Sequence, residues 1–255
     1  MKFYEIIIPL VSKSEIKFIR SLKQKKYRYI HRQFVVEGNK IALESLHYCP
    51  DRILKIFALD SWFSTNQDAL KGINEKLILV STKEMERISF LSTPQEVLCL
   101  LEMGTEEKKD MATGGWSIYL DRIQDPGNLG AMYRVAEWFG ISNMILSPDT
   151  VDIYNPKVIQ ASMGSMLRVT TFEADILWLN DQEPVFRAAM DGGDIYQKDF
   201  PANGILVLGN EGQGVHPSIS GTNISIPRYQ DTAYPESLNV SVAGGILIAE
   251  IMRKR

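Results

Sequence analysis

The chain has 255 residues, 45% of them hydrophobic and 23% charged, with a formal net charge of −3 at pH 7. This composition is ordinary for a soluble globular protein of one or two domains. The sequence has no long apolar run and no signal peptide, which argues against a membrane or secreted protein, so we expect a cytoplasmic location. Cys49 and Cys99 lie far apart in apolar surroundings, and the histidines are scattered, so we expect buried thiols and no metal site.

The N-terminal part of the chain alternates helical and extended patterns. Apolar spacing predicts helices over residues 12–24, 38–47, 66–71 and 82–88, and strands over residues 34–37, 53–59, 77–80 and 96–102. This alternation predicts an α/β domain over residues 1–104 with a partly parallel sheet.

Residues 13–32 form a basic stretch with eight lysines and arginines against one acid, Glu15. We interpret residues 25–32 as a loop in which Tyr27 and Tyr29 are interleaved with the basic side chains. A local basic stripe favours contact with phosphate groups, although a solvated helix face would give the same pattern.

Residues 105–115 are charged and then glycine-rich, which predicts a linker to a second domain over residues 116–255. Its predicted strands are 117–120, 144–146, 168–172, 185–189, 204–208 and 224–226, and its predicted helices are 129–139, 155–163, 175–180 and 237 to the C-terminus. This order predicts a second α/β domain.

Three stretches of this second domain stand out. The turn at residues 125–128 places Asn128 to cap the following helix, whose free N–H groups would suit an anion. The glycine-rich sequence GNEGQG at residues 209–214 follows a strand and allows tight turns and close backbone approach. The last helix is apolar almost all round, which predicts burial on every side, and its Gly244 and Gly245 indicate a close neighbour.

Neither half has a GxGxxG sequence after its first strand, and no GxxxxGK[ST] sequence is present. These absences argue against a nucleotide enzyme of the doubly wound type.

Taken together, three segments resemble the three motifs of the SpoU (TrmH) family of RNA 2'-O-ribose methyltransferases, in the SPOUT superfamily. They are DPGNLGAMYRVAEWFG, VLGNEGQGV and IPRYQDTAYPESLNVSVAGG, in that order along the chain. The segments FVVEGNKIALESL and LSTPQEVLCLLE resemble the substrate-binding domain of the same family, which is similar to ribosomal protein L30e. The resemblance covers nearly the whole chain.

The resemblance implies a C-terminal SPOUT domain with a deep trefoil knot and an N-terminal L30e-like domain. It implies that S-adenosyl-L-methionine binds in the knot, against Leu208, Gly209, Asn210, Gly212, Ile226 and Leu238. It also implies a homodimer.

The implied reaction transfers a methyl group to a ribose 2'-hydroxyl, and the expected substrate is ribosomal RNA. The matching catalytic positions are Arg134, Asn128, Glu211, Ser237 and Asn239. Arg134 matches the residue often assigned as the base, but a guanidinium stays protonated, so stabilising an alkoxide or gripping a phosphate are alternatives. Glu211 would orient Arg134, and Asn128 and Ser237 could equally serve only as helix caps.

The sequence departs from the family pattern in two places. Arg228 replaces a methionine, and the loop at residues 229–235 is about three residues longer than usual. For the structured RNA, the predicted contacts are Lys23, Lys25, Lys26, Arg28 and Arg32. The alternatives are the same chemistry on transfer RNA and an RNA-binding protein that has lost activity.

Overall fold

The computed structural model describes residues 11–104, 115–228 and 237–254, and the chain divides into two compact units. Unit 1 comprises Met1–Thr105 and Tyr154–Leu167, and unit 2 comprises Glu106–Ile153 and Arg168–Arg255. The expected linker, apart from residue 115, and the expected long loop at residues 229–235 lie outside the described residues.

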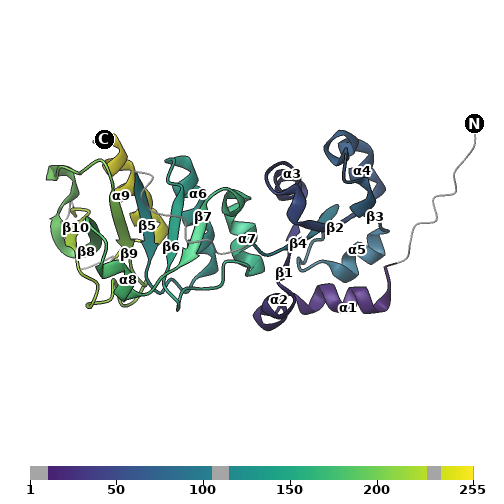
Figure 1. The fold of residues 1–255 in the computed structure, drawn as a ribbon, viewed down its shortest axis with the longest axis horizontal. Helices are drawn as coiled ribbons and strands as arrows, with labels where there is room; N and C mark the ends of the chain where they lie inside the picture. The colour runs from purple at the N-terminus through teal and green to yellow at the C-terminus, as the bar shows by residue number, and fades with distance from the viewer. Residues whose placement is uncertain (1–10, 105–114, 229–236, 255) are drawn as a thin grey trace, which may run out of the picture. The chain divides into compact units, whose positions relative to one another are not determined.

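Unit 1 is built on a four-stranded sheet in the order β1-β4-β2-β3. Strand β4 (Val97–Glu102) runs antiparallel to β1 (Gln33–Glu37) and β2 (Ile53–Ala58), and β3 (Leu77–Leu79) runs parallel to β2. The helices are α1 (Lys13–Ser21), α2 (Lys25–His31), α3 (Asn39–Tyr48), α4 (Asp60–Asn66) and α5 (Thr82–Ile88), with short 3-10 turns η1 (Pro50–Arg52), η2 (Gln67–Leu70) and η3 (Asn74–Lys76) (Figure 1).

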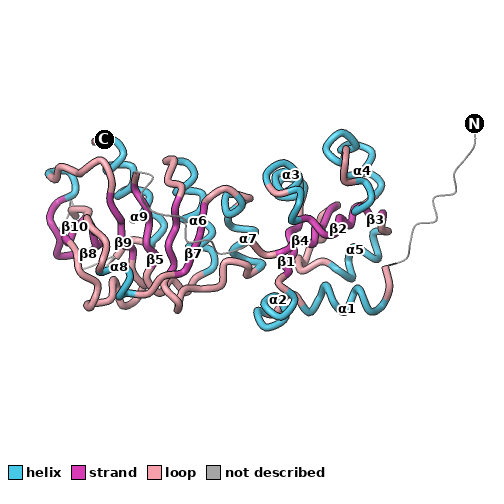
Figure 2. Tube along the Cα trace, viewed as in Figure 1, coloured by secondary structure: helices cyan, strands magenta, loops and turns pink. Residues whose placement is uncertain are grey.

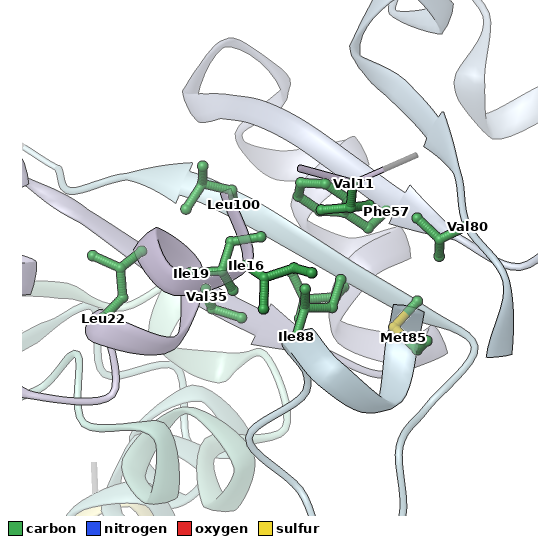
Figure 3. Close-up of a cluster of buried hydrophobic side chains, with 11 residues drawn as sticks. Val11, Ile16, Ile19, Leu22, Val35, Phe57, Val80, Met85, Ile88 and Leu100 are labelled. Atoms are coloured by element: carbon green, nitrogen blue, oxygen red, sulfur yellow. The ribbon is translucent and has the colours of Figure 1, made fainter. Parts of the chain in front are cut away.

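One core of unit 1 lies between the sheet and the helices α1 and α5. Ile16 and Ile19 of α1 are buried against Val35, Phe57 and Leu100 of the strands (Figure 3). Helix α5 is fixed at its start by a capping box, in which Ser81 accepts from Glu84 N and the Glu84 carboxylate accepts from Ser81 N. These contacts fix α1 and α5 against the sheet.

The basic segment at residues 25–32 is not the loop that its sequence predicted. Residues 25–31 form the helix α2, and Arg32 follows it in the left-handed conformation at φ 51°. Arg28 is only 3% exposed, and its Nη1 donates to the carbonyls of Leu22 and Lys23 at 2.9 and 2.8 Å. The predicted RNA contact is therefore wrong for Arg28, because its guanidinium is occupied by backbone carbonyls at the end of α1.

Unit 1 also includes a segment from the second half of the chain, with α7 (Pro156–Ser162) and η5 (Ser165–Leu167). The Tyr154 ring lies 4.7 Å from the Phe34 ring, and its hydroxyl accepts from Gly104 N at 3.1 Å. Gln160 Nε2 donates to Glu37 O at 2.9 Å. These contacts hold the segment against β1.

Unit 2 has a six-stranded, wholly parallel sheet in the order β10-β8-β9-β5-β6-β7. The chain contributes β5 (Trp116–Leu120), α6 (Pro126–Trp138), β6 (Asn143–Leu146), β7 (Thr170–Glu173), α8 (Ile176–Asn180), β8 (Val185–Asp194), η6 (Ile195–Gln197), β9 (Gly204–Leu208), β10 (Thr222–Ser225) and α9 (Val240–Arg253) (Figures 1 and 2). A parallel sheet of this kind is the expected α/β architecture. Leu179 of α8 packs with Tyr119, Ile145 and Val207, and this cluster forms one core of the unit.

The last helix differs from its prediction in two respects. It begins at Val240 with Asn239 as its N-cap, so Ser237 does not open it. One side of α9 is buried at Val240, Gly244, Leu247, Ile248 and Ile251, whereas Val242 is 50% exposed, so the helix is not buried on every side. None of the helices among the described residues has the length and hydrophobicity of a membrane-spanning segment.

Candidate active site

Three polar side chains from distant parts of unit 2 meet at the N-termini of α6 and α9. Asn128 Nδ2 donates to Glu211 Oε1 at 2.8 Å, and Asn239 Nδ2 donates to Asn128 Oδ1 at 2.9 Å. The sequence singled out all three residues, and the fold brings them together.

The N-cap residues of α6 and α9 explain how the Asn128 and Asn239 side chains come to bond to each other. Asp125, not Asn128, caps α6, because its carboxylate accepts from Asn128 N at 2.8 Å. The prediction that Asn128 is the cap is therefore wrong, and its amide is directed to Glu211 and Asn239 instead. Asn239 is itself the cap of α9, since its Oδ1 accepts from Ser241 N and Val242 N at 2.9 and 3.3 Å.

Within the described residues, two other predicted catalytic residues form no hydrogen bond with this cluster. Arg134 is exposed on α6, and among the described residues it forms no hydrogen bond or ion pair. The expected contact between Glu211 and Arg134 is not formed, because Glu211 pairs with Asn128. Ser237 is exposed and lines the pocket described next.

A pocket of about 980 Å³ lies beside the cluster, at the carboxyl ends of β8, β9 and β10. This edge of a parallel sheet is where ligands of open α/β folds bind. Glu211 lines the pocket, as do all of the residues predicted to bind the cofactor: Leu208, Gly209, Asn210, Gly212, Ile226 and Leu238.

Gly209 explains how the glycine-rich loop forms one wall. A Cβ atom at this position would lie 2.2 Å from Gly214 C and from Val215 N, so no side chain fits. Gly214 N donates to Asn210 O at 2.9 Å, and Asn210 Oδ1 accepts from Gly212 N and Gln213 N, each at 3.0 Å. The loop therefore folds back on itself and leaves a backbone surface on the pocket.

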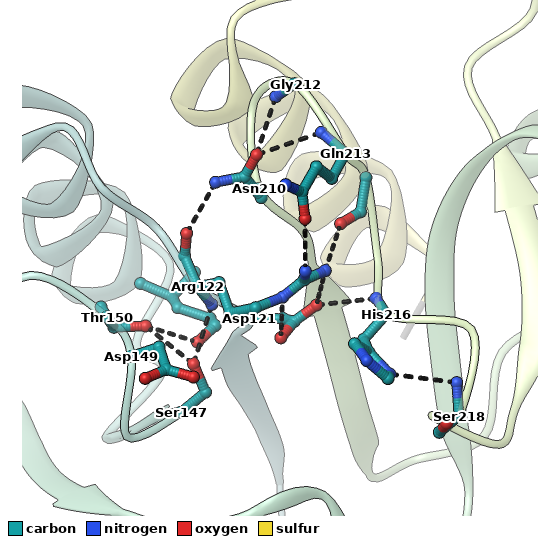
Figure 4. Close-up of polar contacts among 12 residues, drawn as sticks. Asp121, Arg122, Ser147, Asp149, Thr150, Asn210, Gly212, Gln213, His216 and Ser218 are labelled. Atoms are coloured by element: carbon teal, nitrogen blue, oxygen red, sulfur yellow. Dashed lines mark hydrogen bonds and ion pairs between the residues drawn. The ribbon is translucent and has the colours of Figure 1, made fainter.

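The loop is fastened to the end of β5 by a polar network that the sequence did not reveal (Figure 4). Arg122 bonds both Asp121 carboxylate oxygens, at 3.1 and 3.0 Å. Its terminal nitrogens also donate to Gln213 Oε1 at 2.6 Å and Gly214 O at 3.1 Å. The hydrogen bonds that Arg122 donates to Asp121 raise the pKa of Arg122, so its guanidinium stays charged.

The Asp121 carboxylate also accepts from His216 N at 2.7 Å, and Asn210 Nδ2 donates to Arg122 O at 2.9 Å. Arg122 has a φ of 56°, a conformation uncommon for a residue with a side chain. In the sequence, this network could have been inferred only from an aspartate followed by an arginine directly after a predicted strand. Asp121 is only 1% exposed, which explains why the pair must be so fully bonded.

No cluster of three or more potential metal ligands occurs among the residues that the structure describes. The pocket is lined by backbone groups, apolar side chains, amides and the charged side chains of Arg187, Asp191, Glu211 and Arg228.

Comparisons with known proteins agree over both halves of the chain. The SpoU rRNA Methylase family matches residues 115–249, and the MRM3-like substrate binding domain matches residues 13–99. The 23S rRNA (guanosine(2553)-2'-O)-methyltransferase RlmP of Bacillus subtilis is 29% identical over 92% of this chain and 94% of its own length.

Solved structures show the same likeness. A TrmH-family protein from Porphyromonas gingivalis superposes with a TM-score of 0.86 at 31% identity, over 96% of this chain and 100% of that chain. An AdoMet-bound rRNA methyltransferase from Sinorhizobium meliloti superposes with a TM-score of 0.81 at 26% identity, over 95% of this chain and 96% of that chain. The chain belongs to the SpoU rRNA methylase family.

Proposed function

We propose that the protein transfers a methyl group from S-adenosyl-L-methionine to a ribose 2'-hydroxyl of ribosomal RNA. The observation that carries this proposal is the meeting of Asn128, Glu211 and Asn239 beside the glycine-walled pocket. Relatives named as rRNA 2'-O-methyltransferases, such as those of Bacillus subtilis and Coxiella burnetii, support the substrate class.

The pocket fits the cofactor on its own chemistry. Gly209 has no room for a side chain, so the loop can offer its backbone amides and carbonyls to a ligand. Leu208, Ile226 and Leu238 add apolar surface for a planar base. When bound, S-adenosylmethionine supplies an activated methyl group. The residues of the chain then have to bind the cofactor and align the ribose hydroxyl with its methyl group. They also have to assist removal of the hydroxyl proton.

We assign Arg134 the role of stabilising the negative charge that develops on the ribose oxygen. A guanidinium remains protonated at ordinary pH, so it serves poorly as a base and well as a donor to an oxyanion or a neighbouring phosphate. Its exposure on α6 leaves it accessible to RNA. Asn128, held between Glu211 and Asn239, positions polar groups at the pocket, and Ser237 on the pocket wall is a further substrate contact.

Unit 1 supplies the RNA-binding surface in this proposal. Lys23, Lys25, Lys26 and Arg32 are exposed around the helix α2. Structured RNA is recognised largely through its phosphates and its shape, which such a surface suits. The match to a substrate binding domain over residues 13–99 supports this role. We further propose that an L30e-like domain spans residues 1–104 and that the methyltransferase domain spans residues 116–255.

Two architectural properties complete the proposal: a trefoil knot in the C-terminal domain and a homodimer. The likeness to TrmH-family structures supports the knot, which an experimental trace from β10 to α9 would test.

Exposed apolar residues on α6 and α9 and just before α9 support the dimer, since Trp138 is 85%, Val242 50% and Leu238 47% exposed. Light scattering of Trp138→Glu beside the wild type tests it; a wild-type monomer at micromolar concentration would contradict the dimer.

Incubation of the purified protein with unmodified ribosomal and transfer RNA and labelled S-adenosylmethionine tests the reaction. Nucleoside analysis should give 2'-O-methylated ribose in ribosomal RNA. Label only in transfer RNA would correct the substrate. Cofactor binding with no transfer to either RNA would favour a protein that has lost activity.

A further inference from the structure

The part of the glycine-rich loop that carries Glu211 is not held by burial. Residues 211–214 are all exposed. An exposed backbone opens and rearranges readily unless hydrogen bonds hold it. Glu211 nevertheless accepts from Asn128 Nδ2 at 2.8 Å. The polar contacts that fix the loop therefore decide whether the Glu211 carboxylate reaches the Asn128 amide.

Arg122 bonds the loop on both sides of Glu211 (Figure 4). On the N-terminal side, Asn210 Nδ2 donates to Arg122 O at 2.9 Å. On the C-terminal side, the Arg122 guanidinium donates to Gln213 Oε1 at 2.6 Å and to Gly214 O at 3.1 Å. The backbone and the side chain of one residue thus hold both flanks of Glu211.

Asp121 holds the two ends of the same loop. Its N–H donates to Leu208 O at 2.8 Å, and its carboxylate accepts from His216 N at 2.7 Å. The same carboxylate accepts from the Arg122 guanidinium at 3.0 and 3.1 Å. Asp121 directly follows β5, a buried strand that pairs on both sides within the sheet. The position of the loop is therefore set by the sheet.

The backbone of Arg122 is itself fixed in an uncommon conformation, with a φ of 56°. Arg122 N donates to Ser147 Oγ at 2.8 Å, and Thr150 Oγ1 lies 3.1 Å from the same oxygen and donates to Leu120 O at 3.0 Å. Such conformations persist where the surrounding contacts over-determine them, and they gather at functional sites. In this conformation both the carbonyl and the guanidinium of Arg122 reach the loop.

We propose that Arg122, held by Asp121, is a positioning residue for methyl transfer, because it sets the place of Glu211 and thereby the orientation of the Asn128 amide. This inference rests on the proposed function, since it gives Arg122 a part in that reaction. The planar donors of a guanidinium bond a carboxylate, an amide oxygen and a backbone carbonyl at once. A lysine ammonium is a single point charge and does not reproduce that geometry.

Single-turnover methyl transfer to ribosomal RNA at saturating cofactor tests the role. Gln213→Ala removes one bond to the loop and leaves the pair of Arg122 with Asp121 intact, so it should fold and should lower the rate about tenfold. Arg122→Lys should lower the rate at least as much. Wild-type rates in both variants would overturn the inference.

Gln182→Ala is the matched control. Gln182 Nε2 also donates to a backbone carbonyl in unit 2, Trp178 O at 3.1 Å, but it does not bond the glycine-rich loop. Its rate should stay within about twofold of the wild type. A loss as large as that of Gln213→Ala would overturn the inference, because any lost glutamine bond would then have the same effect.

A double-mutant cycle with Glu211 separates positioning from a general loss of stability. In a Glu211→Ala background, Gln213→Ala should change the rate by less than about twofold, because two changes that act through one group are not additive. The same loss in both backgrounds would show that the Gln213 bond does not act through Glu211, and it would overturn the inference.

The side-chain amide resonance of Asn128 gives a readout that needs neither cofactor nor RNA. It is identified in isotope-labelled protein by its absence from Asn128→Ala. Glu211→Ala should shift it, and Arg122→Lys should shift it in the same direction. A resonance that moves in Glu211→Ala but stays at its wild-type position in Arg122→Lys would overturn the inference. A wild type that transfers no methyl group would overturn the proposed function, while the two shifts would still show that Arg122 positions Asn128.

Discussion

Asn128 Nδ2 lies 2.8 Å from Glu211 Oε1, although the two residues are 83 positions apart in the chain. A carboxylate only accepts, so Glu211 fixes the NH₂ end of the Asn128 amide. Asn239 Nδ2 then donates to the Oδ1 end at 2.9 Å. The starts of α6 and α9 and the glycine-rich loop are tied together by the orientation of this one amide.

Replacing Asn128 by Asp should therefore break the link in a defined way. The new carboxylate would face Glu211, and like charges in contact repel each other. We expect methyl transfer to fall by about tenfold or more, the equivalent of one charged hydrogen bond. Single-turnover transfer with labelled cofactor measures the loss. An unchanged rate would show that the Asn128–Glu211 contact does not serve catalysis.

Arg134 should matter for transfer and not for cofactor binding. It does not line the pocket, and it is exposed on α6. Arg134→Ala should lower single-turnover methyl transfer by about a hundredfold, as removal of one oxyanion donor does. Calorimetry should give wild-type affinity for S-adenosylhomocysteine. Arg134→Lys is the control, because it keeps the positive charge and loses the bidentate geometry of the guanidinium. Its rate should lie between those of the alanine variant and the wild type. Wild-type turnover in the alanine variant would remove Arg134 from the mechanism.

The basic surface around α2 should set the salt dependence of RNA binding. Replacing Lys23, Lys25 and Lys26 by Gln removes up to three phosphate contacts. The slope of log affinity against log salt should then become shallower by about 2. Arg28 is left in place, because its buried guanidinium holds the end of α1.

The matched control for that variant is the triple replacement of Lys40, Lys71 and Lys83, which are exposed elsewhere in the sequence of unit 1. It changes the net charge equally, and its salt slope should stay close to that of the wild type. Equal slopes for the two triple variants would mean that only overall charge matters.

The adjacent glycines of α9 should respond in opposite ways to alanine. A Cβ atom on Gly244 would lie 2.7 Å from Leu208 Cδ1 and 2.9 Å from Met132 Sδ, whereas on Gly245 the nearest atom is 4.0 Å away. Gly244→Ala should destabilise the protein by roughly 1–3 kcal/mol through overpacking. Gly245→Ala should be neutral or stabilise by up to about 1 kcal/mol through helix propensity. Chemical denaturation measures both, and equal effects would contradict this packing of α9.

Cys99 should be unreactive while unit 1 is folded. Burial raises the pKa of its thiol to about 12, and the side chain is fully enclosed. The thiolate is the reactive form, so alkylation at mildly alkaline pH should be negligible. The measurement uses a Cys49→Ser background, with labelling complete only in concentrated guanidinium chloride. Rapid labelling of the native protein would show that β4 is not buried as described.

The sequence by itself determined the α/β class, the family and the polar residues of the site. Period-two and helical patterns are local properties, and motifs such as DPGNLG and GNEGQG hold their chemistry in a few consecutive residues. For the same reason it placed Asn128, Glu211 and Asn239 on separate segments without showing that they bond to one another.

Only the tertiary structure decided which side chains are occupied elsewhere. The sequence predicted Arg28 as a phosphate contact, but its Nη1 donates to the backbone carbonyls of Leu22 and Lys23 at the end of α1. Gly244 and Gly245 are the same residue type, yet only Gly244 faces Leu208 and Met132. The pairing of Arg187 with Asn223 depends on strand register, and the Arg122 network joins loops far apart in the chain. Burial and pairing depend on neighbours that are distant in sequence, and a local pattern does not record them.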